Sequence, residues 1–239
     1  DTAEADFEKR IESLLEWEVR ADPKVETHVK TIVKRVRSGG DSALVALTAE
    51  YDNFSVSSME ELTISPDQCR EAYESLIYSD KRALNEAADR IRLFHEMQTD
   101  ESFEIEDEHG NFLGYRVTPI PHVGVYIPGG HAAYPSTVLM TTIPARIAGV
   151  REITAVVPTP EGECNQHVLA SMHLASVDRV YAVGGAQAIA ALAYGTETIE
   201  AVDKIVGPGG TYVTAAKRLV YGPVGIDTIA GPTEILIVA

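Results

Sequence analysis

Short β-branched segments alternate with alanine-rich segments throughout the second half of the chain, and this alternation constrains the fold more than any other feature. Each short segment ends in Gly or Pro, and each alanine-rich segment has a composition typical of a helix. The expected strands are residues 123–127, 153–157, 179–183 and 204–206, and the expected helices are residues 134–148, 164–175, 186–193 and 211–220. Because such repeats form βαβ crossovers, the sequence predicts an α/β fold with Rossmann-like parallel sheet domains.

Helices are expected to fill most of the first 120 residues. Apolar residues recur there at three- and four-residue steps, and a capping box at Ser65 and Gln68 begins one of the helices. A pair of glycines, Gly39-Gly40, is expected to end one helix before Asp41 begins the next. The expected elements are helices over residues 7–19, 25–36, 41–50, 66–77 and 80–98, and a hairpin over residues 103–117 with its turn at Gly110-Asn111.

Composition and charge exclude several classes of function. The formal net charge of −16 argues against a nucleic-acid partner, because such a partner requires a basic face. No apolar run approaches the roughly 20 residues needed to cross a membrane, and the first residues do not resemble a secretory signal. The cysteines, Cys69 and Cys164, are too few for a disulfide framework or a thiolate metal site. We therefore expect a cytoplasmic protein with no membrane partner.

Three glycine-rich turns follow expected strands and precede expected helices. They are Pro128-Gly129-Gly130, Gly184-Gly185 and Gly207-Pro208-Gly209-Gly210. Ligands of open parallel sheets bind at this edge, where helix amino-termini present free N–H groups. Each turn alone fits a plain connection, but three together favour a ligand. None matches the standard dinucleotide, P-loop or hydrolase fingerprint, so the pattern predicts a ligand-binding α/β domain without naming the ligand.

The residues alone predict neither a metal site nor a catalytic group. The seven histidines include no H-x-x-x-H pair, and His131, which follows the first glycine turn, is expected to be a solvent-exposed loop residue. His167 and His173 are six residues apart on a helix, a spacing that places them on different faces. Glu234 enters an apolar strand, where a carboxylate needs a partner, and we expect that partner to be structural.

Five blocks of the second half, the first of which has three segments, identify a family resemblance. They are Val-Gly-Val-Tyr-Ile-Pro-Gly-Gly (123–130) with Tyr-Pro-Ser-Thr-Val-Leu-Met (134–140) and Ile-Pro-Ala-Arg-Ile-Ala-Gly-Val (143–150), Gly-Gly-Ala-Gln-Ala-Ile-Ala-Ala-Leu-Ala-Tyr-Gly (184–195), Lys-Ile-Val-Gly-Pro-Gly (204–209), Ala-Ala-Lys-Arg (215–218) and Ala-Gly-Pro-Thr-Glu-Ile-Leu (230–236). In this order and at these spacings the chain resembles the histidinol dehydrogenases. The resemblance implies a homodimeric enzyme that oxidises L-histidinol to L-histidine through an aldehyde, with NAD as oxidant and a zinc ion holding the substrate.

The resemblance also implies roles for individual residues. Tyr126 and Gln187 match a tyrosine and a glutamine that contact NAD, and Thr233 matches a Ser or Thr beside the substrate. Gly210 stands where the family usually has an Asn that also contacts NAD, so this position lacks a side-chain amide. Losing one such hydrogen bond costs on the order of 1 kcal/mol, so we expect weaker NAD binding rather than none.

The family's zinc ligands, its general base histidine and the neighbouring glutamate follow the Ala-Gly-Pro-Thr-Glu motif and lie beyond residue 239. We therefore expect an incomplete chain that is inactive alone. Four regions are expected: a helical segment over residues 1–20, the first part of domain 1 over residues 21–122, a Rossmann-like NAD-binding domain over residues 123–232, and an unfinished return strand into domain 1 over residues 233–239.

Two other functions remain open at this point. One is a dehydrogenase for a sulfonated diol, of the sulfopropanediol type, which shares the superfamily fold but looks different around the first glycine turn. The other is a non-catalytic NAD-binding module, which Gly210 and the missing zinc ligands favour.

Overall fold

A six-stranded sheet forms the centre of the computed structural model, which describes residues 6–15, 22–129 and 132–229. The strand order is β1-β6-β5-β4-β7-β8. Four parallel strands form its middle: β4 (His122–Tyr126), β5 (Glu152–Val156), β6 (Arg179–Tyr181) and β7 (Lys204–Val206). β8 (Gly225–Ile226) extends the sheet in parallel, and β1 (Thr63–Ile64) closes its other edge in antiparallel pairing with β6. The α/β prediction is confirmed.

The helices that connect these strands also lie where the sequence predicted them. They are α5 (Pro135–Ile147), α6 (Gln166–Leu174), α7 (Gly185–Tyr194) and α8 (Thr211–Val220), with a short 3-10 turn at Pro160–Gly162. The bounds of β7 and α8 are as predicted, and the others differ by one or two residues. The difference at α6 has a local cause, because the Asn165 side chain accepts a hydrogen bond from the N–H of His167 and so begins the helix.

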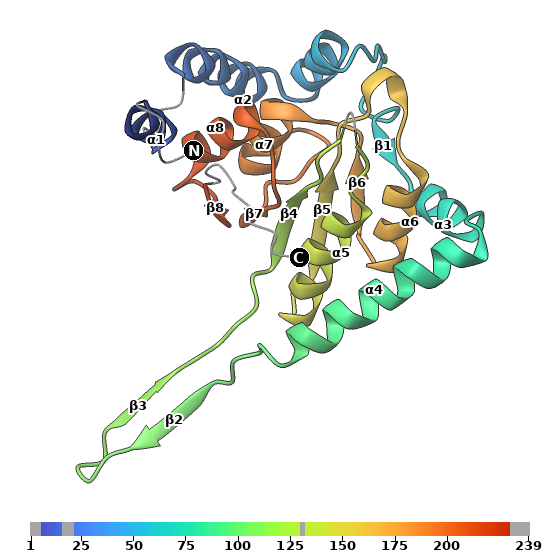
Figure 1. The fold of residues 1–239 in the computed structure, drawn as a ribbon. Helices are drawn as coiled ribbons and strands as arrows, with labels where there is room; N and C mark the ends of the chain where they lie inside the picture. Colours follow the sequence, from blue (N-terminus) through green and yellow to red (C-terminus); the bar gives the residue numbers. More distant parts are fainter. Residues whose placement is uncertain (1–5, 16–21, 130–131, 230–239) are drawn as a thin grey trace.

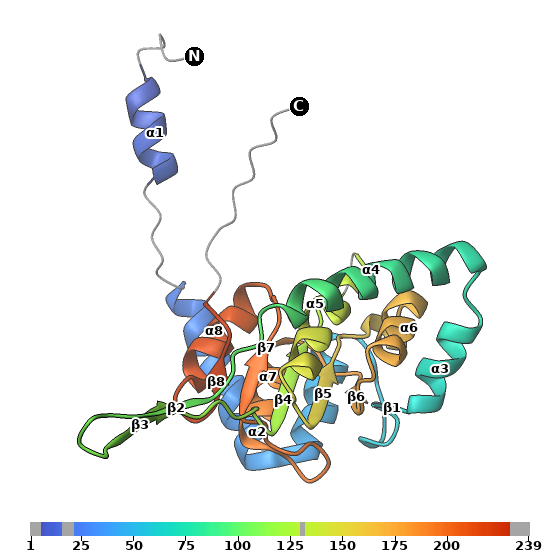
Figure 2. The ribbon, with the colours of Figure 1, turned by 90° about the horizontal axis from the view of Figure 1, so that it is seen from below.

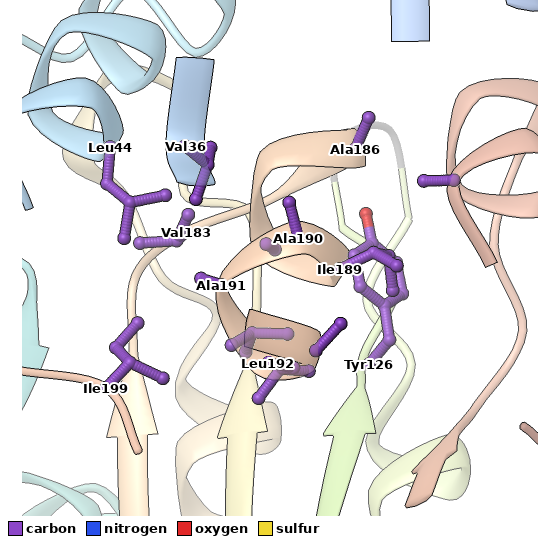
Figure 3. Packing of buried hydrophobic residues seen from close by; sticks show 14 of the residues in the cluster. Val36, Leu44, Tyr126, Val183, Ala186, Ile189, Ala190, Ala191, Leu192 and Ile199 are labelled. Carbon is purple, nitrogen blue, oxygen red and sulfur yellow. The ribbon is translucent and has the colours of Figure 1, made fainter. Parts of the chain in front are cut away.

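Helices cover the sheet in two layers. α4 (Tyr78–Glu96), α5 and α6 pack together on one face, while α2 (Pro23–Tyr51), α7 and α8 pack together on the other (Figures 1 and 2). Successive residues of β4 alternate between the two cores, so that Val123 and Val125 join the first and Tyr126 joins the second. The second core is rich in alanine from α7, which brings this helix close to the sheet (Figure 3). This close packing fixes the start of α7 relative to the strand ends.

The amino-terminal helices follow the predicted pattern with local differences. α1 (Phe7–Leu15) and α3 (Pro66–Glu74) lie within their expected ranges, and the capping box of Ser65 and Gln68 is present. The predicted break at Gly40 is a kink inside α2, where Gly40 has φ +50° and ψ −133°. α4 begins two residues earlier than predicted, at Tyr78, so that Asp80 lies in its first turn.

The predicted hairpin projects away from the sheet as an arm (Figure 1). Its strands are β2 (Phe103–Glu106) and β3 (Phe112–Tyr115), and both faces are exposed. Phe103 and Tyr115 pack edge to face across the strands with 4.6 Å between ring centroids. Within the described ranges, no helix is long and apolar enough to cross a membrane.

Candidate functional site

The predicted ligand edge of the sheet brings the end of β4 against the start of α7. Tyr126 is the last residue of β4 and points toward α7 (Figure 3). Its hydroxyl oxygen accepts a hydrogen bond from the backbone N–H of Gly185 at 3.1 Å. Gly185 has φ +65°, a conformation that favours glycine. Burial is the main cause that raises the pKa of the Tyr126 phenol, so the hydroxyl stays protonated at neutral pH. The end of β4, which leads into the first glycine turn, thus contacts the second glycine turn.

Gln187 faces a pocket beside that contact. Its side chain is 1% exposed and makes no hydrogen bond to another described residue. The pocket has a volume of about 310 Å³ and is lined by His28, Ile32, Tyr51, Asp52, Gly185, Ala186, Gln187 and Tyr212. The amide atoms keep accessible surface at the pocket, so a ligand bound there can exchange hydrogen bonds with them. Tyr126 and Gln187 therefore lie on either side of the same turn.

Three aromatic rings form one wall of this pocket. His28 lies between Tyr51 and Tyr212, with 5.9 Å from its ring centroid to each of theirs. The Nε2 atom of His28 is 2.8 Å from the hydroxyl oxygen of Tyr51, which fixes the orientation of both rings. Tyr51 and Tyr212 are 41% and 49% exposed, so both keep apolar surface that a planar ligand can cover.

The third glycine turn is held by a buried ion pair. Lys217 of α8 is 4% exposed, and its Nζ donates to the carbonyl oxygen of Gly207 at 2.5 Å and to Asp227 Oδ1 at 2.7 Å. Asp227 Oδ2 accepts from the N–H of Gly207 at 2.8 Å. Both polar groups of Gly207 are thus bonded to side chains of one ion pair. The pair fixes the turn from which α8 begins.

Gly210 occupies the N-cap position of α8 and leaves open space. A Cβ atom placed on it meets nothing within 4 Å, and its φ of −70° suits any residue. No side chain caps this helix. Gly210 does not line the pocket of Gln187, but Tyr212 in the same helical turn does. An asparagine would therefore fit at position 210 without strain.

The remaining candidates of the sequence fall outside the pocket or outside the described residues. Gly130, His131, Thr233 and Glu234 lie outside the described ranges. His167 is paired with Asp80 at 2.8 Å, and the His173 ring packs on Tyr73, so the two histidines have separate partners. Burial raises the pKa of both Cys69 and Cys164 to about 11, which keeps these thiols protonated.

One group of potential metal ligands lies at the opposite edge of the sheet. The ligand atoms of His122, Glu152 and Glu200 lie within 4.8 Å of one another. Arg179 already occupies the space between the carboxylates, with 2.8 Å to Glu152 and 3.2 Å to Glu200. A cation at this place would displace an existing ion pair. The group is therefore a structural ion-pair network at the amino ends of the strands.

Sequence reasoning missed the residues that surround the predicted ones. Asp52, His28 and Tyr51 come from the first half of the chain, and no local pattern connects them with the glycine turns. The sequence contained only a weak indication of the pair formed by Lys217 and Asp227. A lysine on the face of an alanine-rich helix that packs on a sheet needs a charged partner. Only the fold brings these residues to one edge of the sheet.

Comparisons with known proteins place the chain in a family. The model of the family described as histidinol dehydrogenase matches residues 16–239. The chain belongs to the histidinol dehydrogenase family. A histidinol dehydrogenase of Psychrobacter arcticus is 52% identical over 238 residues, and one of Chromobacterium violaceum is 51% identical over 237 residues. These alignments cover 100% and 99% of this chain and 55% of each relative, so the chain spans about half the length of the histidinol dehydrogenases that it matches.

A solved histidinol dehydrogenase supports the same assignment at the level of structure. The crystal structure of the enzyme from Elizabethkingia anophelis aligns with a TM-score of 0.85 at 35% identity. The alignment covers 94% of this chain and 52% of that one. The arrangement of the sheet and its helices is therefore the one found in this family.

Proposed function

We propose that the chain is the NAD-binding part of a dehydrogenase that oxidises L-histidinol to L-histidine through the aldehyde. The observation that carries this proposal is the unpartnered amide of Gln187, which is 1% exposed and faces a pocket beside Tyr126. The family name of the matched relatives supplies the substrate. Family membership and a pocket at the start of α7 thus support the same function.

The residues at this edge fit NAD. The first turn of α7 carries backbone N–H groups without intrahelical partners, which suit a phosphate. The Gln187 amide can both donate and accept hydrogen bonds. NAD would accept the hydride that leaves the alcohol carbon, and later the hydrated aldehyde carbon, of the substrate. Tyr126 and Gln187 would bind and orient the dinucleotide. The alanine-rich helix α7, which packs closely on the sheet, would exclude water from the side of the dinucleotide that faces the protein.

The described residues do not fit zinc. The group of His122, Glu152 and Glu200 holds Arg179 and lies at the edge of the sheet opposite to the pocket. We propose, from the family resemblance, that the zinc ligands and the general base belong to residues beyond 239, and that Thr233 places its hydroxyl beside the histidinol. Residues 1–239 alone should then bind NAD without oxidising histidinol.

We propose a cytoplasmic homodimer for the whole protein. Large apolar side chains exposed on the hairpin arm, such as Phe112 and Leu113, support a further contact for this arm. The division into residues 1–20, 21–122, 123–232 and 233–239 remains a prediction.

Replacing Gln187 by alanine should weaken NAD binding about 10- to 100-fold, because a buried hydrogen-bonding group of the site is lost. Isothermal titration of the chain with NAD measures this change. Gln68→Ala, in the capping box of α3 on the other face of the sheet, is the matched control and should leave the NAD affinity unchanged. Equal affinities for the Gln187→Ala variant and the unmodified chain would refute the proposed site.

Replacing Gly210 by asparagine should strengthen NAD binding about fivefold, by restoring one amide hydrogen bond of about 1 kcal/mol. The open space at this position and its φ of −70° accept the side chain without strain. The same titration measures the change, with Gly210→Ala as the variant that adds a Cβ without an amide. If both variants bind NAD as the unmodified chain does, position 210 has no contact with the dinucleotide.

The sulfonated-diol alternative is distinguished by turnover. A full-length relative of this chain that carries the remaining residues should oxidise histidinol in preference to the sulfonated diol. The Tyr-Ile-Pro-Gly-Gly and Tyr-Pro-Ser motifs support this preference. NAD-dependent oxidation of the sulfonated diol alone would overturn the substrate assignment.

A further inference from the structure

Asp52 is held rigidly at the rim of the pocket that Gln187 faces. It caps the end of α2, where its N–H donates to the carbonyl oxygen of Thr48 at 2.9 Å. Its own carbonyl oxygen accepts from the N–H of Glu161 at 2.9 Å, which ties it to the loop after β5. The backbone of Asp52 is therefore bonded on both sides, and its side chain has a fixed place among the lining residues.

The carboxylate of Asp52 has an unused acceptor. Its Oδ2 atom is buried and has no hydrogen-bond partner among the described residues. A buried carboxylate oxygen without a donor costs free energy, and no Lys or Arg lines the pocket to offset that cost. Burial accordingly raises the pKa of Asp52. The other carboxylate oxygen, Oδ1, also has no described partner and keeps accessible surface, so Asp52 and the amide of Gln187 line the same pocket of about 310 Å³.

The shape and lining of the pocket fit one nucleoside. Ligand pockets commonly span about 300–1,000 Å³, so this one holds a single ring system with its sugar rather than a whole dinucleotide. The half-exposed rings of Tyr51 and Tyr212 offer stacking surface for a base. A carboxylate can accept a hydrogen bond from a sugar hydroxyl, whereas it would repel a phosphate.

We propose that Asp52 accepts a hydrogen bond from the 2′-hydroxyl of the adenosine ribose of NAD, and that it excludes NADP from the same pocket. Carboxylates near a glycine turn do this in other dinucleotide sites, where the 2′-phosphate of NADP has no room beside them. This assignment rests on the proposed function, because it presupposes that the pocket binds NAD. It adds a residue from the first half of the chain that determines which dinucleotide is bound.

The test compares Asp52→Asn with the unmodified chain in titrations with NAD, NADP and the analogue of NAD that lacks the adenosine 2′-hydroxyl. The unmodified chain should bind NAD at least tenfold more tightly than either of the other two. Asp52→Asn should bind NAD about tenfold more weakly, because a neutral amide oxygen accepts a weaker hydrogen bond than a carboxylate, bind NADP more tightly, and distinguish NAD from the deoxy analogue less than the unmodified chain does. Asp67→Asn, an exposed aspartate in the first turn of α3, is the matched control and should change none of these affinities.

Two outcomes would overturn the assignment, and they are distinguishable. If the unmodified chain binds NAD and Asp52→Asn weakens NAD and the deoxy analogue equally, the proposed function stands and Asp52 has only a structural role. If the unmodified chain binds no NAD, the proposed function fails together with this inference. Thermal unfolding followed by circular dichroism reports folding of each variant. Removal of an unpaired buried charge should leave the melting temperature of Asp52→Asn unchanged or raise it.

Discussion

Replacing Lys217 by methionine is expected to lower the free energy of unfolding by about 2–3 kcal/mol, because Asp227 loses its charged partner and the Gly207 carbonyl oxygen loses its donor. Lys217 is 4% exposed and bonds both Asp227 and the carbonyl oxygen of Gly207, so methionine fills the space but replaces neither contact. Urea unfolding of the two proteins, followed by circular dichroism, measures the difference.

A second variant separates the ion pair from the packing of α8. The double substitution Lys217→Met with Asp227→Leu removes both charges and should recover part of the lost stability, since no unpaired charge remains. Arg218→Met, the neighbouring position on α8, is the control and should change the free energy of unfolding by less than about 0.5 kcal/mol. A loss below about 1 kcal/mol for Lys217→Met would show that the pair is not structural.

Replacing Gly207 by alanine should cost about 3 kcal/mol of stability, because both the conformation and the space at this position exclude a Cβ atom. Gly207 has φ +114°, and a Cβ placed on it would lie 2.2 Å from the carbonyl oxygen of Tyr126. The turn must shift away from β4 to relieve this contact, so NAD affinity should fall as well.

Gly210→Ala is the matched control, since it adds the same atom in the same turn. At Gly210 the added atom meets nothing within 4 Å, and the backbone has φ −70°. Urea unfolding should therefore separate the two alanine variants by at least about 2 kcal/mol. Equal stabilities would mean that the turn is free to move and does not position the start of α8.

The sequence predicted the sheet and most of its helices because these elements depend on local patterns. The bounds of β7 and α8 came directly from a short β-branched run and from the amphipathic segment after Gly210. The start of α4 was harder to predict, because an aspartate such as Asp80 suits both the N-cap and the first turn of a helix. The edge strand β1 has only two residues, and its pairing with β6 depends on contacts far apart in the chain.

Some residues of the candidate site could be predicted from the sequence, and others could not. Tyr126 and Gln187 lie within motifs that the family resemblance identifies, so the sequence was sufficient to name them. His28 lies in α2 and Asp52 caps the end of this helix, which packs on α7 more than 100 residues away in the chain, and no spacing rule connects them with α7. The buried pair of Lys217 and Asp227 also required the structure, because a charged residue in sequence is usually a surface residue.

A crystal structure of the chain grown with saturating NAD tests the central claim most directly. We expect the dinucleotide at the carboxyl ends of β4 and β6, with a hydrogen bond to the Gln187 amide and its adenosine in the pocket that Tyr51 and Tyr212 line. NAD bound elsewhere, or a pocket left empty in crystals whose solution holds NAD well above its measured dissociation constant, would contradict the claim.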